Sequence, residues 1–130
     1  MDIILSIQKI FVLYPEIKIA YLYGSAAKNR LRSDSDIDIA VSVQRPLSID
    51  ERLDIINSLS KGLGREIDLV DLSTTHGLLL YEIMTKGKLI LCKNTPLKTE
   101  LMKEVVYFAE DFLPQIEDFL ERKIRRFTGG

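Results

Sequence analysis

Residues 24–38 read GSAAKNRLRSDSDID, and this stretch decides how the rest of the 130-residue chain is interpreted. A Gly-Ser step is followed by a basic, polar loop and then by two aspartates, Asp36 and Asp38, with one residue between them. The segment 36–43, DIDIAVSV, alternates polar and apolar residues, which predicts a strand with both carboxylates on one face. Two ionised carboxylates about 7 Å apart repel each other, and a bound divalent cation removes that conflict.

The residues around the two aspartates suit a magnesium-nucleotide site. Mg²⁺ prefers oxygen ligands and binds through one or two carboxylates together with substrate phosphates and water. Gly24 lets the backbone approach a ligand closely, and the turn or helix start after Ser25 exposes N–H groups that can hold phosphate oxygens. Lys28, Arg30 and Arg32 in the loop are candidates for neutralising a polyphosphate.

A third acid is expected where two metal ions are held, and the segment 65–72, REIDLVDL, offers one. Asp68 shares a strand face with Glu66, whereas Asp71 lies on the other face and is interpreted as a strand-end residue or helix cap. If this strand pairs beside the DIDIAVSV strand, Asp68 lies next to Asp38. One helix separates the two strands, so the spacing permits either strand direction.

Predicted helices and strands interleave, which indicates an α/β (α+β) fold with a mixed four-stranded sheet flanked by helices and a C-terminal helical extension. We interpret residues 1–130 as a single domain. The predicted helices span about 2–13, 49–63, 75–86 and 96–126, and the predicted strands span about 18–24, 36–43, 65–72 and 88–92.

Several local features sharpen these boundaries. Ser48 and Glu51 form a capping box. Thr95 is expected to cap the last helix, which Pro114 is expected to kink or split. Cys92 has an apolar flank and is expected to be buried.

The last helix carries aromatic residues that are expected to lie mostly in the core, with any exposed excess forming a protein interface. They are Tyr107, Phe108, Phe112 and Phe119. The apolar stripe of this helix does not choose between a dimer and a hetero-complex. His76, the single histidine, is expected to cap a helix or lie on the surface.

Composition narrows the class of protein. The formal net charge is −1, so no direct nucleic-acid binding is expected. A single cysteine excludes an internal disulfide and favours the cytoplasm. No apolar run approaches the roughly 20 residues of a membrane span, and the N-terminus lacks the basic region of a signal peptide.

Gly24-Ser25, ten intervening residues and then Asp36-Ile37-Asp38 resemble the signature of the DNA-polymerase-β-type nucleotidyltransferases. The short length and the EIDLVDL segment resemble the minimal nucleotidyltransferases of prokaryotes. Within that group the chain is similar to the MntA-type antitoxins, the partners of HEPN-domain ribonuclease toxins. The segments GLLLYEIMTKGKLILC and YFAEDFLPQIEDFLERK resemble the corresponding end of those proteins, so the resemblance covers nearly the whole chain.

The resemblance implies a role for each motif residue. Gly24 and Ser25 would bind the nucleotide triphosphate, and Asp36 and Asp38 would hold two Mg²⁺ ions. Asp68 would complete the metal site and assist deprotonation of the acceptor. The implied reaction transfers AMP from ATP to a hydroxyl and releases pyrophosphate. In the antitoxin branch this hydroxyl belongs to a tyrosine of the toxin, whose RNase activity the added nucleotide blocks.

The chain departs from the family's GSRARG pattern after the Gly-Ser step, where it carries Ala26, Lys28 and Asn29. A lysine meets a phosphate as a point charge without the fork of an arginine, and asparagine tolerates left-handed backbone angles. Lys28 and Arg30 remain the candidate phosphate ligands of the loop.

Two alternative functions stay open. In the first, the chain would be a non-catalytic antitoxin that neutralises its partner by binding alone. In the second, it would be a nucleotidyltransferase acting on a small molecule or tRNA. Enzymes of the second kind that resemble this chain normally add another domain to hold the acceptor, which favours an external protein partner.

Overall fold

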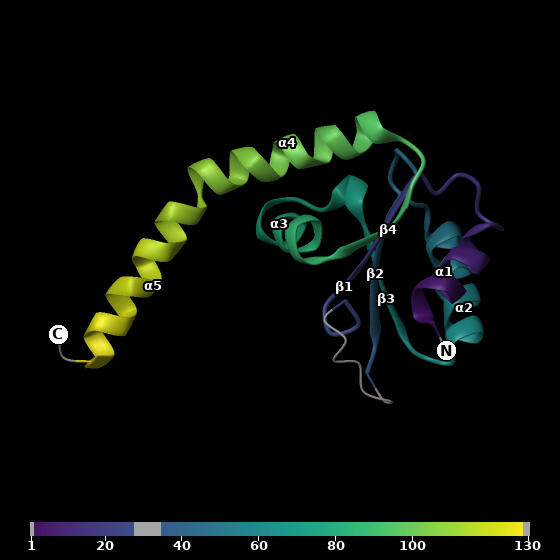
Figure 1. The fold of residues 1–130 in the computed structure, drawn as a ribbon, viewed down its shortest axis with the longest axis horizontal. Helices are drawn as coiled ribbons and strands as arrows, with labels where there is room; N and C mark the ends of the chain where they lie inside the picture. The colour runs from purple at the N-terminus through teal and green to yellow at the C-terminus, as the bar shows by residue number, and fades with distance from the viewer. Residues whose placement is uncertain (1, 28–34, 129–130) are drawn as a thin grey trace.

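The protein, described by a computed structural model over residues 2–27 and 35–128, is a sheet covered by helices on both faces (Figure 1). In chain order the elements are α1 (Ile3–Phe11), β1 (Ile19–Tyr23), β2 (Ile37–Ser42), α2 (Ile49–Leu63), β3 (Ile67–Asp71), the 3₁₀ turn η1 (Leu72–Thr74), α3 (Gly77–Lys86), β4 (Lys88–Cys92), α4 (Thr95–Asp111) and α5 (Leu113–Thr128). All four predicted strands and the predicted helices are therefore present.

The four strands lie in the order β3-β2-β1-β4. β1 is antiparallel to both β2 and β4, whereas β2 and β3 are parallel and are joined through α2. The mixed sheet is as predicted, and the direction of β3, which the sequence left open, is set by this crossover. α1 and α2 cover one face of the sheet, and α3 and α4 cover the other (Figure 1).

The alternation of β2 separates two hydrophobic layers. Ile39 and Val41 belong to the layer under α1 and α2, with Phe11 and Leu59. Ala40 belongs to the opposite layer, in which α3 and α4 contribute Leu80, Ile83 and Val105. Because both layers are filled, β2, which carries Asp38, is fixed on both sides.

The start of α2 agrees with the sequence, and the start of α4 does not. The capping box is present: the Ser48 hydroxyl accepts from the Glu51 amide, and the Glu51 carboxylate accepts from the Ser48 amide. Thr95 is the first residue of α4, and the cap is Asn94, whose Oδ1 accepts from the Leu97 amide at 3.0 Å. The prediction of Thr95 as the cap was wrong by one residue, because asparagine fills this position as well as threonine does.

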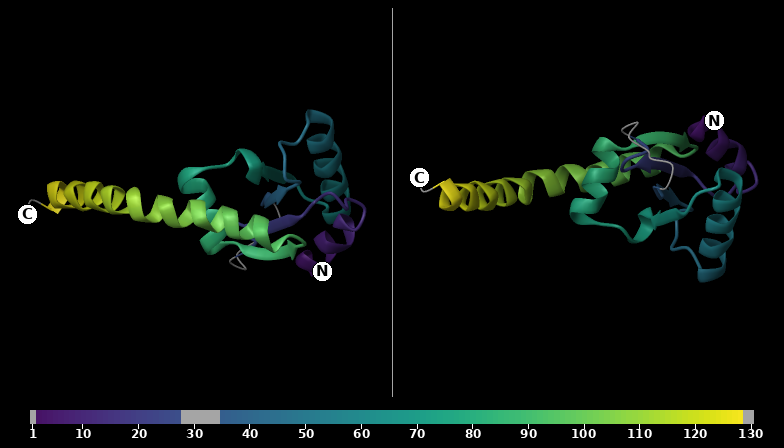
Figure 2. Two further views of the ribbon diagram at one scale, coloured as in Figure 1. Left: turned by 90° about the horizontal axis from the view of Figure 1, so that it is seen from above. Right: turned by 90° about the horizontal axis from the view of Figure 1, so that it is seen from below.

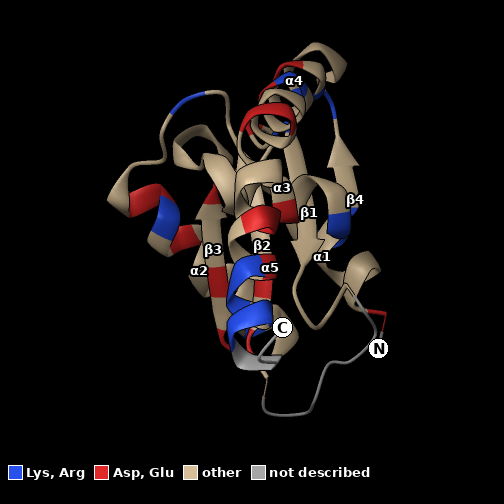
Figure 3. Ribbon diagram, turned by 90° about the vertical axis from the view of Figure 1, so that its left-hand side faces the viewer, with Lys and Arg blue, Asp and Glu red and all other residues tan. Residues whose placement is uncertain are grey.

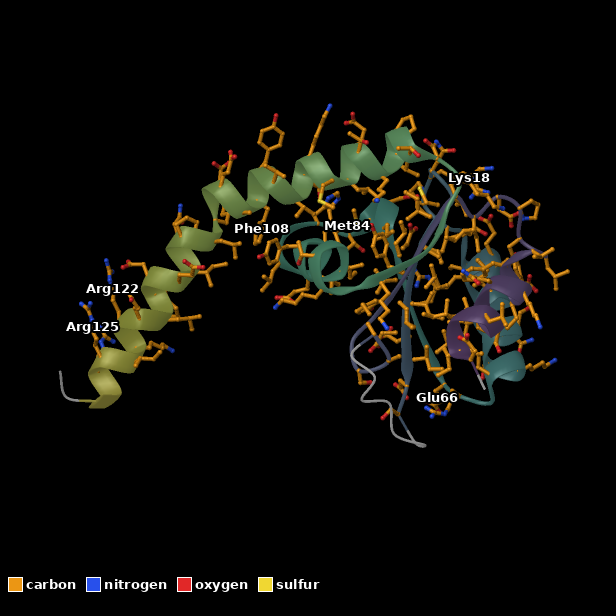
Figure 4. All side chains as sticks on the ribbon, in the orientation of Figure 1. Lys18, Glu66, Met84, Phe108, Arg122 and Arg125 are labelled. Carbon is orange, nitrogen blue, oxygen red and sulfur yellow. The ribbon has the colours of Figure 1, made fainter. Side chains whose placement is uncertain are left out.

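The long C-terminal helix is split, as Pro114 predicts, into α4 and α5. α5 projects beyond the sheet and its helices (Figures 1 and 2). Tyr107 on α4, Phe112 between the helices and Phe119 on α5 are 65%, 54% and 56% exposed, so the expectation that these aromatic residues lie mostly in the core was wrong. Phe108, labelled in Figure 4, is half-buried. Its ring packs against that of Tyr81, with centroids 5.9 Å apart.

Two further side chains test the sequence predictions. Cys92 is exposed rather than buried, because it ends β4, an edge strand on which only Ile90 is fully buried. His76 is on the surface, as expected, and its Nδ1 lies 3.0 Å from the Glu104 carboxylate. Across residues 2–27 and 35–128, no helix is long and apolar enough to cross a membrane.

Asp71, at the end of β3, is a buried acid that links two loops at this end of the sheet. One carboxylate oxygen accepts from the Leu47 amide at 2.8 Å, and the other accepts from the Ser73 amide at 2.9 Å. Its backbone carbonyl accepts from the Thr75 hydroxyl at 2.7 Å. Asp71 therefore joins the loop before α2 to the turn after β3, and its prediction as a strand-end residue or cap is confirmed.

We predict that Asp71→Asn lowers the free energy of unfolding by about 2 kcal/mol, because a side-chain NH₂ group replaces one of the two buried Asp71 oxygens that each accept from a backbone amide. Urea unfolding followed by circular dichroism measures the change. Asp68→Asn is the matched control: it makes the same chemical change at an exposed strand position and is expected not to destabilise the protein. Equal losses in both variants would contradict the role given to Asp71.

Candidate active site

Three polar side chains form a row across the sheet at the carboxyl end of β1. Tyr23 pairs with Asp38 in the antiparallel β1–β2 ladder, and Asp38 pairs with Asp68 in the parallel β2–β3 ladder. Directly paired residues point to the same face, which here is the face covered by α3 and α4. The predicted placement of Asp68 beside Asp38 is therefore confirmed.

The environment of Asp38 disfavours its charge. Burial raises the pKa of Asp38 from 3.8 to about 6, helped by the charge of Asp68, by a hydrogen bond to it and by the charge of Asp36. The pKa of Tyr23 is also raised, first by burial and then by the charges of Asp68 and Asp38. This end of the sheet thus concentrates negative charge that a cation would relieve.

Asp36 stands just before β2 and is exposed. Its charge contributes to the raised pKa of Asp38. Over the described ranges 2–27 and 35–128, however, no three acidic, histidine or cysteine side chains lie close enough together to hold a metal ion. The expected convergence of Asp36, Asp38 and Asp68 is therefore only partly formed: Asp38 and Asp68 adjoin, and Asp36 lies at their margin. Arg65 donates to the carbonyl of Ser35 at 3.0 Å and so links the residues before β3 to those before β2. No feature of the sequence pointed to this contact.

Gly24 follows β1 with a left-handed φ of +69° and begins a turn that also contains Ser25. A Cβ on Gly24 would collide with a carboxylate oxygen of Asp38 and would lie 3.2 Å from its Cγ. Because Gly24 has no side chain, the Asp38 carboxylate can occupy this space. This contact joins the two halves of the sequence motif, the Gly-Ser step and the Asp-x-Asp pair.

The loop bases Lys28, Arg30 and Arg32 lie outside the described residues. α3 supplies a different cation: a cavity of about 200 Å³ beside the glycine is lined by Tyr23, Gly24, Glu82 and Lys86. The Lys86 ammonium lies 2.9 Å from the Glu82 carboxylate. The i, i+4 spacing of acid and base predicts this ion pair, but no feature of the sequence places the last turn of α3 beside Gly24.

The donors at this end of the sheet fit a hard divalent cation. Asp38 and Asp68 offer carboxylate oxygens, and Asp36 stands within electrostatic reach of Asp38. Their mutual repulsion is the arrangement that Mg²⁺ relieves, with remaining positions of its shell left for phosphate oxygens and water.

Comparison with known families identifies this arrangement. The family model described as polymerase beta, nucleotidyltransferase matches residues 6–96, which include both halves of the motif and β3. The chain belongs to this nucleotidyltransferase family. The match runs from within α1 to the first residues of α4 and so includes the whole sheet and the row of polar side chains.

Individual members of the nucleotidyltransferase family are similar to the chain. The protein adenylyltransferase MntA of Shewanella oneidensis is 34% identical over 74 residues, which cover 57% of this chain and 53% of that protein. The matched region thus spans about half the length of this relative.

Solved structures show the same fold. A chain of a toxin–antitoxin crystal structure with AMP-PNP has a TM-score of 0.72 at 23% identity, covering 92% of this chain and 99% of its own. A chain of the tri-AMPylated Shewanella oneidensis HEPN toxin in complex with MNT antitoxin has a TM-score of 0.63 at 24% identity, covering 89% and 97%. The polymerase-β-like fold predicted from the sequence is therefore confirmed.

We predict that Asp38→Asn stabilises the metal-free protein by about 1 kcal/mol at neutral pH, a value reduced for the solvent exposure of this site. The pKa of Asp38 is higher in the folded protein, so its charge opposes folding fully above pH 6 and not at all below about pH 4. The advantage of the variant should therefore shrink as the pH falls from 6 to 4. Urea unfolding at several pH values in EDTA measures it, and a pH-independent difference would contradict the repulsion.

We predict that Gly24→Ala and Gly64→Ala differ in function rather than in stability. Both glycines have similar left-handed φ values, +69° and +65°, so each alanine should cost roughly 1 kcal/mol of unfolding free energy. A Cβ on Gly64 meets nothing within 4 Å, whereas one on Gly24 displaces the Asp38 carboxylate. Calorimetry should show Mg-ATP affinity at least about 10-fold weaker for Gly24→Ala only; equal affinity in both variants would refute the role of this contact.

Proposed function

We propose that the chain is a Mg²⁺-dependent nucleotidyltransferase that transfers AMP from ATP to a tyrosine hydroxyl of a HEPN-domain ribonuclease toxin, and that it acts as an antitoxin in the cytoplasm. The observation that carries the proposal is the Asp38–Asp68 carboxylate pair, which adjoins the Gly24 turn. Membership of the nucleotidyltransferase family supports the reaction class. The similarity to a protein adenylyltransferase and to a chain of an AMPylated HEPN–MNT complex supports the acceptor.

The nucleotide is bound at the turn after β1. Gly24 lies against the Asp38 carboxylate, and Ser25 follows it in the same turn, so N–H groups of this turn can hold phosphate oxygens. Lys28 and Arg30, which follow this turn in the sequence, would add positive charge toward the phosphates. Lys86, from the cavity beside Gly24, offers a further cation for the same phosphates.

Asp36, Asp38 and Asp68 would hold two Mg²⁺ ions. When bound, these ions would neutralise the phosphates, polarise the α-phosphorus and lower the pKa of the acceptor hydroxyl. The raised pKa of Asp38 is consistent with this assignment, because a carboxylate whose charge is disfavoured gains most from a bound cation.

The transfer replaces one phosphorus–oxygen bond by another. The acceptor oxygen forms a bond to the α-phosphorus of ATP, and the bond from that phosphorus to the bridging oxygen breaks. Its electron pair leaves with pyrophosphate. Asp68 takes the hydroxyl proton, because it is the exposed member of the pair and is open to an incoming acceptor. The product is a tyrosine that carries a negatively charged nucleotide, which would block a ribonuclease site by bulk and charge.

Neutralisation by binding alone is the second candidate, and the exposed apolar residues of α5 favour it. A substitution of Asp38 distinguishes the two candidate functions, because Asp38 lies in the sheet and not among the exposed apolar residues of α5. A catalytic antitoxin requires this carboxylate, whereas a purely binding antitoxin does not.

We predict that Asp38→Asn lowers Mg²⁺-dependent transfer of α-labelled AMP to the HEPN-domain protein of the same genome by roughly 100-fold or more. EDTA should abolish transfer by the wild type. Arg122→Ser, on the outer side of α5, is the control and should transfer as the wild type does. Label appearing in a small molecule or in tRNA instead of the protein would identify a different acceptor.

Growth of cells that express the toxin completes the test. Wild-type protein should restore growth, and Asp38→Asn should not, although it still folds. Full protection by Asp38→Asn would establish neutralisation by contact and overturn the catalytic proposal.

A further inference from the structure

α3 ends in close contact with the last residues of β1. Lys88, the first residue of β4, pairs with Leu22 of β1. The residue before it, Gly87, therefore lies beside Tyr23. A Cβ on Gly87 would lie 3.1 Å from the carbonyl oxygen of Leu22 and 3.3 Å from the Cβ of Tyr23. The position of Lys86, the last residue of α3, is consequently fixed by backbone packing against β1.

Gly87 extends the row of Asp68, Asp38 and Tyr23 to a fourth position across the sheet. The row has carboxylates at its β2–β3 end, and the C-terminus of α3, with Lys86, at its β4 end. Figure 3 shows this division in the ribbon, with acidic segments on β3 and β2 and a basic segment near the start of β4, beyond β1. A chain of phosphates lying across the Gly24 turn would therefore have its two ends in opposite electrostatic surroundings.

Lys86 is held at this position by Glu82. Its Nζ lies 2.9 Å from one carboxylate oxygen of Glu82 and 3.2 Å from the other. The side chains of Lys86 and Glu82 are 56% and 41% exposed, and an exposed ion pair adds little to stability. Both also line the cavity that touches Gly24. Lys86 can therefore exchange Glu82 for another anion in that cavity at low cost.

A phosphate is a stronger partner for Lys86 than Glu82 is. It offers more acceptor oxygens and more negative charge than one carboxylate, and a lysine binds it as a point charge. In the proposed reaction Asp68 takes the acceptor proton, so the reacting α-phosphorus belongs at the end of the row that carries Asp38 and Asp68. The phosphates that trail away from it toward β4 are the β- and γ-phosphates.

We propose that Lys86 binds the β- and γ-phosphates of ATP, the part that leaves as pyrophosphate, and that Glu82 holds Lys86 as an internal competitor until the triphosphate displaces it. This inference rests on the proposed function, and it adds which residues select a triphosphate over a monophosphate. Glu82 acts on the nucleotide only through Lys86. The two members of one ion pair therefore have opposite effects: Lys86 strengthens ATP binding, and Glu82 weakens it.

The first test is calorimetry without an acceptor protein. Lys86→Met should weaken the affinity for Mg-ATP and for Mg-pyrophosphate at least about 10-fold, and should leave the affinity for AMP within about twofold. Lys86→Arg, which keeps the charge, should stay within about threefold of the wild type for Mg-ATP. Glu82→Gln should tighten Mg-ATP binding about threefold, because it removes the competing charge.

Lys88→Met is the matched control. Lys88 lies two residues further along the chain, but it pairs with Leu22, which belongs to the layer under α1 and α2, so its side chain points to the other face of the sheet. This variant should bind Mg-ATP within about twofold of the wild type. An ion pair that only stabilises α3 predicts that Lys86→Met and Glu82→Gln change the affinity in the same direction, since both break the pair. That result, or unchanged Mg-ATP affinity in Lys86→Met, would overturn the inference.

The second test uses transfer to the HEPN-domain protein. Lys86→Met should lower kcat/KM for ATP at least about 10-fold and leave KM for the acceptor within about twofold. If the wild type transfers no AMP but the opposite shifts in Mg-ATP affinity are present, the proposed function is overturned and the role of Lys86 is supported. If the wild type binds no Mg-ATP, both are overturned.

Discussion

Repulsion between two carboxylates is the constraint around which this fold is arranged. Asp38 and Asp68 are held side by side because β2 and β3 are paired in register, and the apolar residues on either side of them prevent the strands from shifting. Hydrophobic burial of the sheet thus supplies the free energy that opposes this repulsion. The glycine after β1 belongs to the same arrangement, because a side chain there would occupy the space of Asp38.

Periodicity and turn residues were sufficient to predict the elements and most of the site. The alternation of β2 placed Asp38 opposite the apolar face, and the helix between β2 and β3 limited the possible pairings. Spacing alone did not determine the direction of β3, which depends on packing of α2 against the sheet. Lys86 and Arg65 reach the site through tertiary packing, so no local pattern marked them as neighbours of Gly24 and the residues before β2.

The errors share one physical origin. An apolar residue was assumed to be buried, but burial depends on what lies opposite, which a single sequence does not specify. Cys92 ends an edge strand, and Phe112 and Phe119 stay more than half exposed, with Phe112 stacked on Phe108 and Lys123 lying over the Phe119 ring. In α5 this mismatch between pattern and burial is informative, because it marks a surface that the domain itself does not use.

The junction between α4 and α5 has a mechanical consequence. Proline has no amide proton, so the residue at 114 cannot bond to the carbonyl four positions earlier, and one rung of the helical ladder is missing where the axis bends. The angle between the two helices can consequently vary at low energetic cost, without disturbing the sheet. A change of this angle would re-aim α5 and leave the strands that carry Tyr23, Asp38 and Asp68 in place.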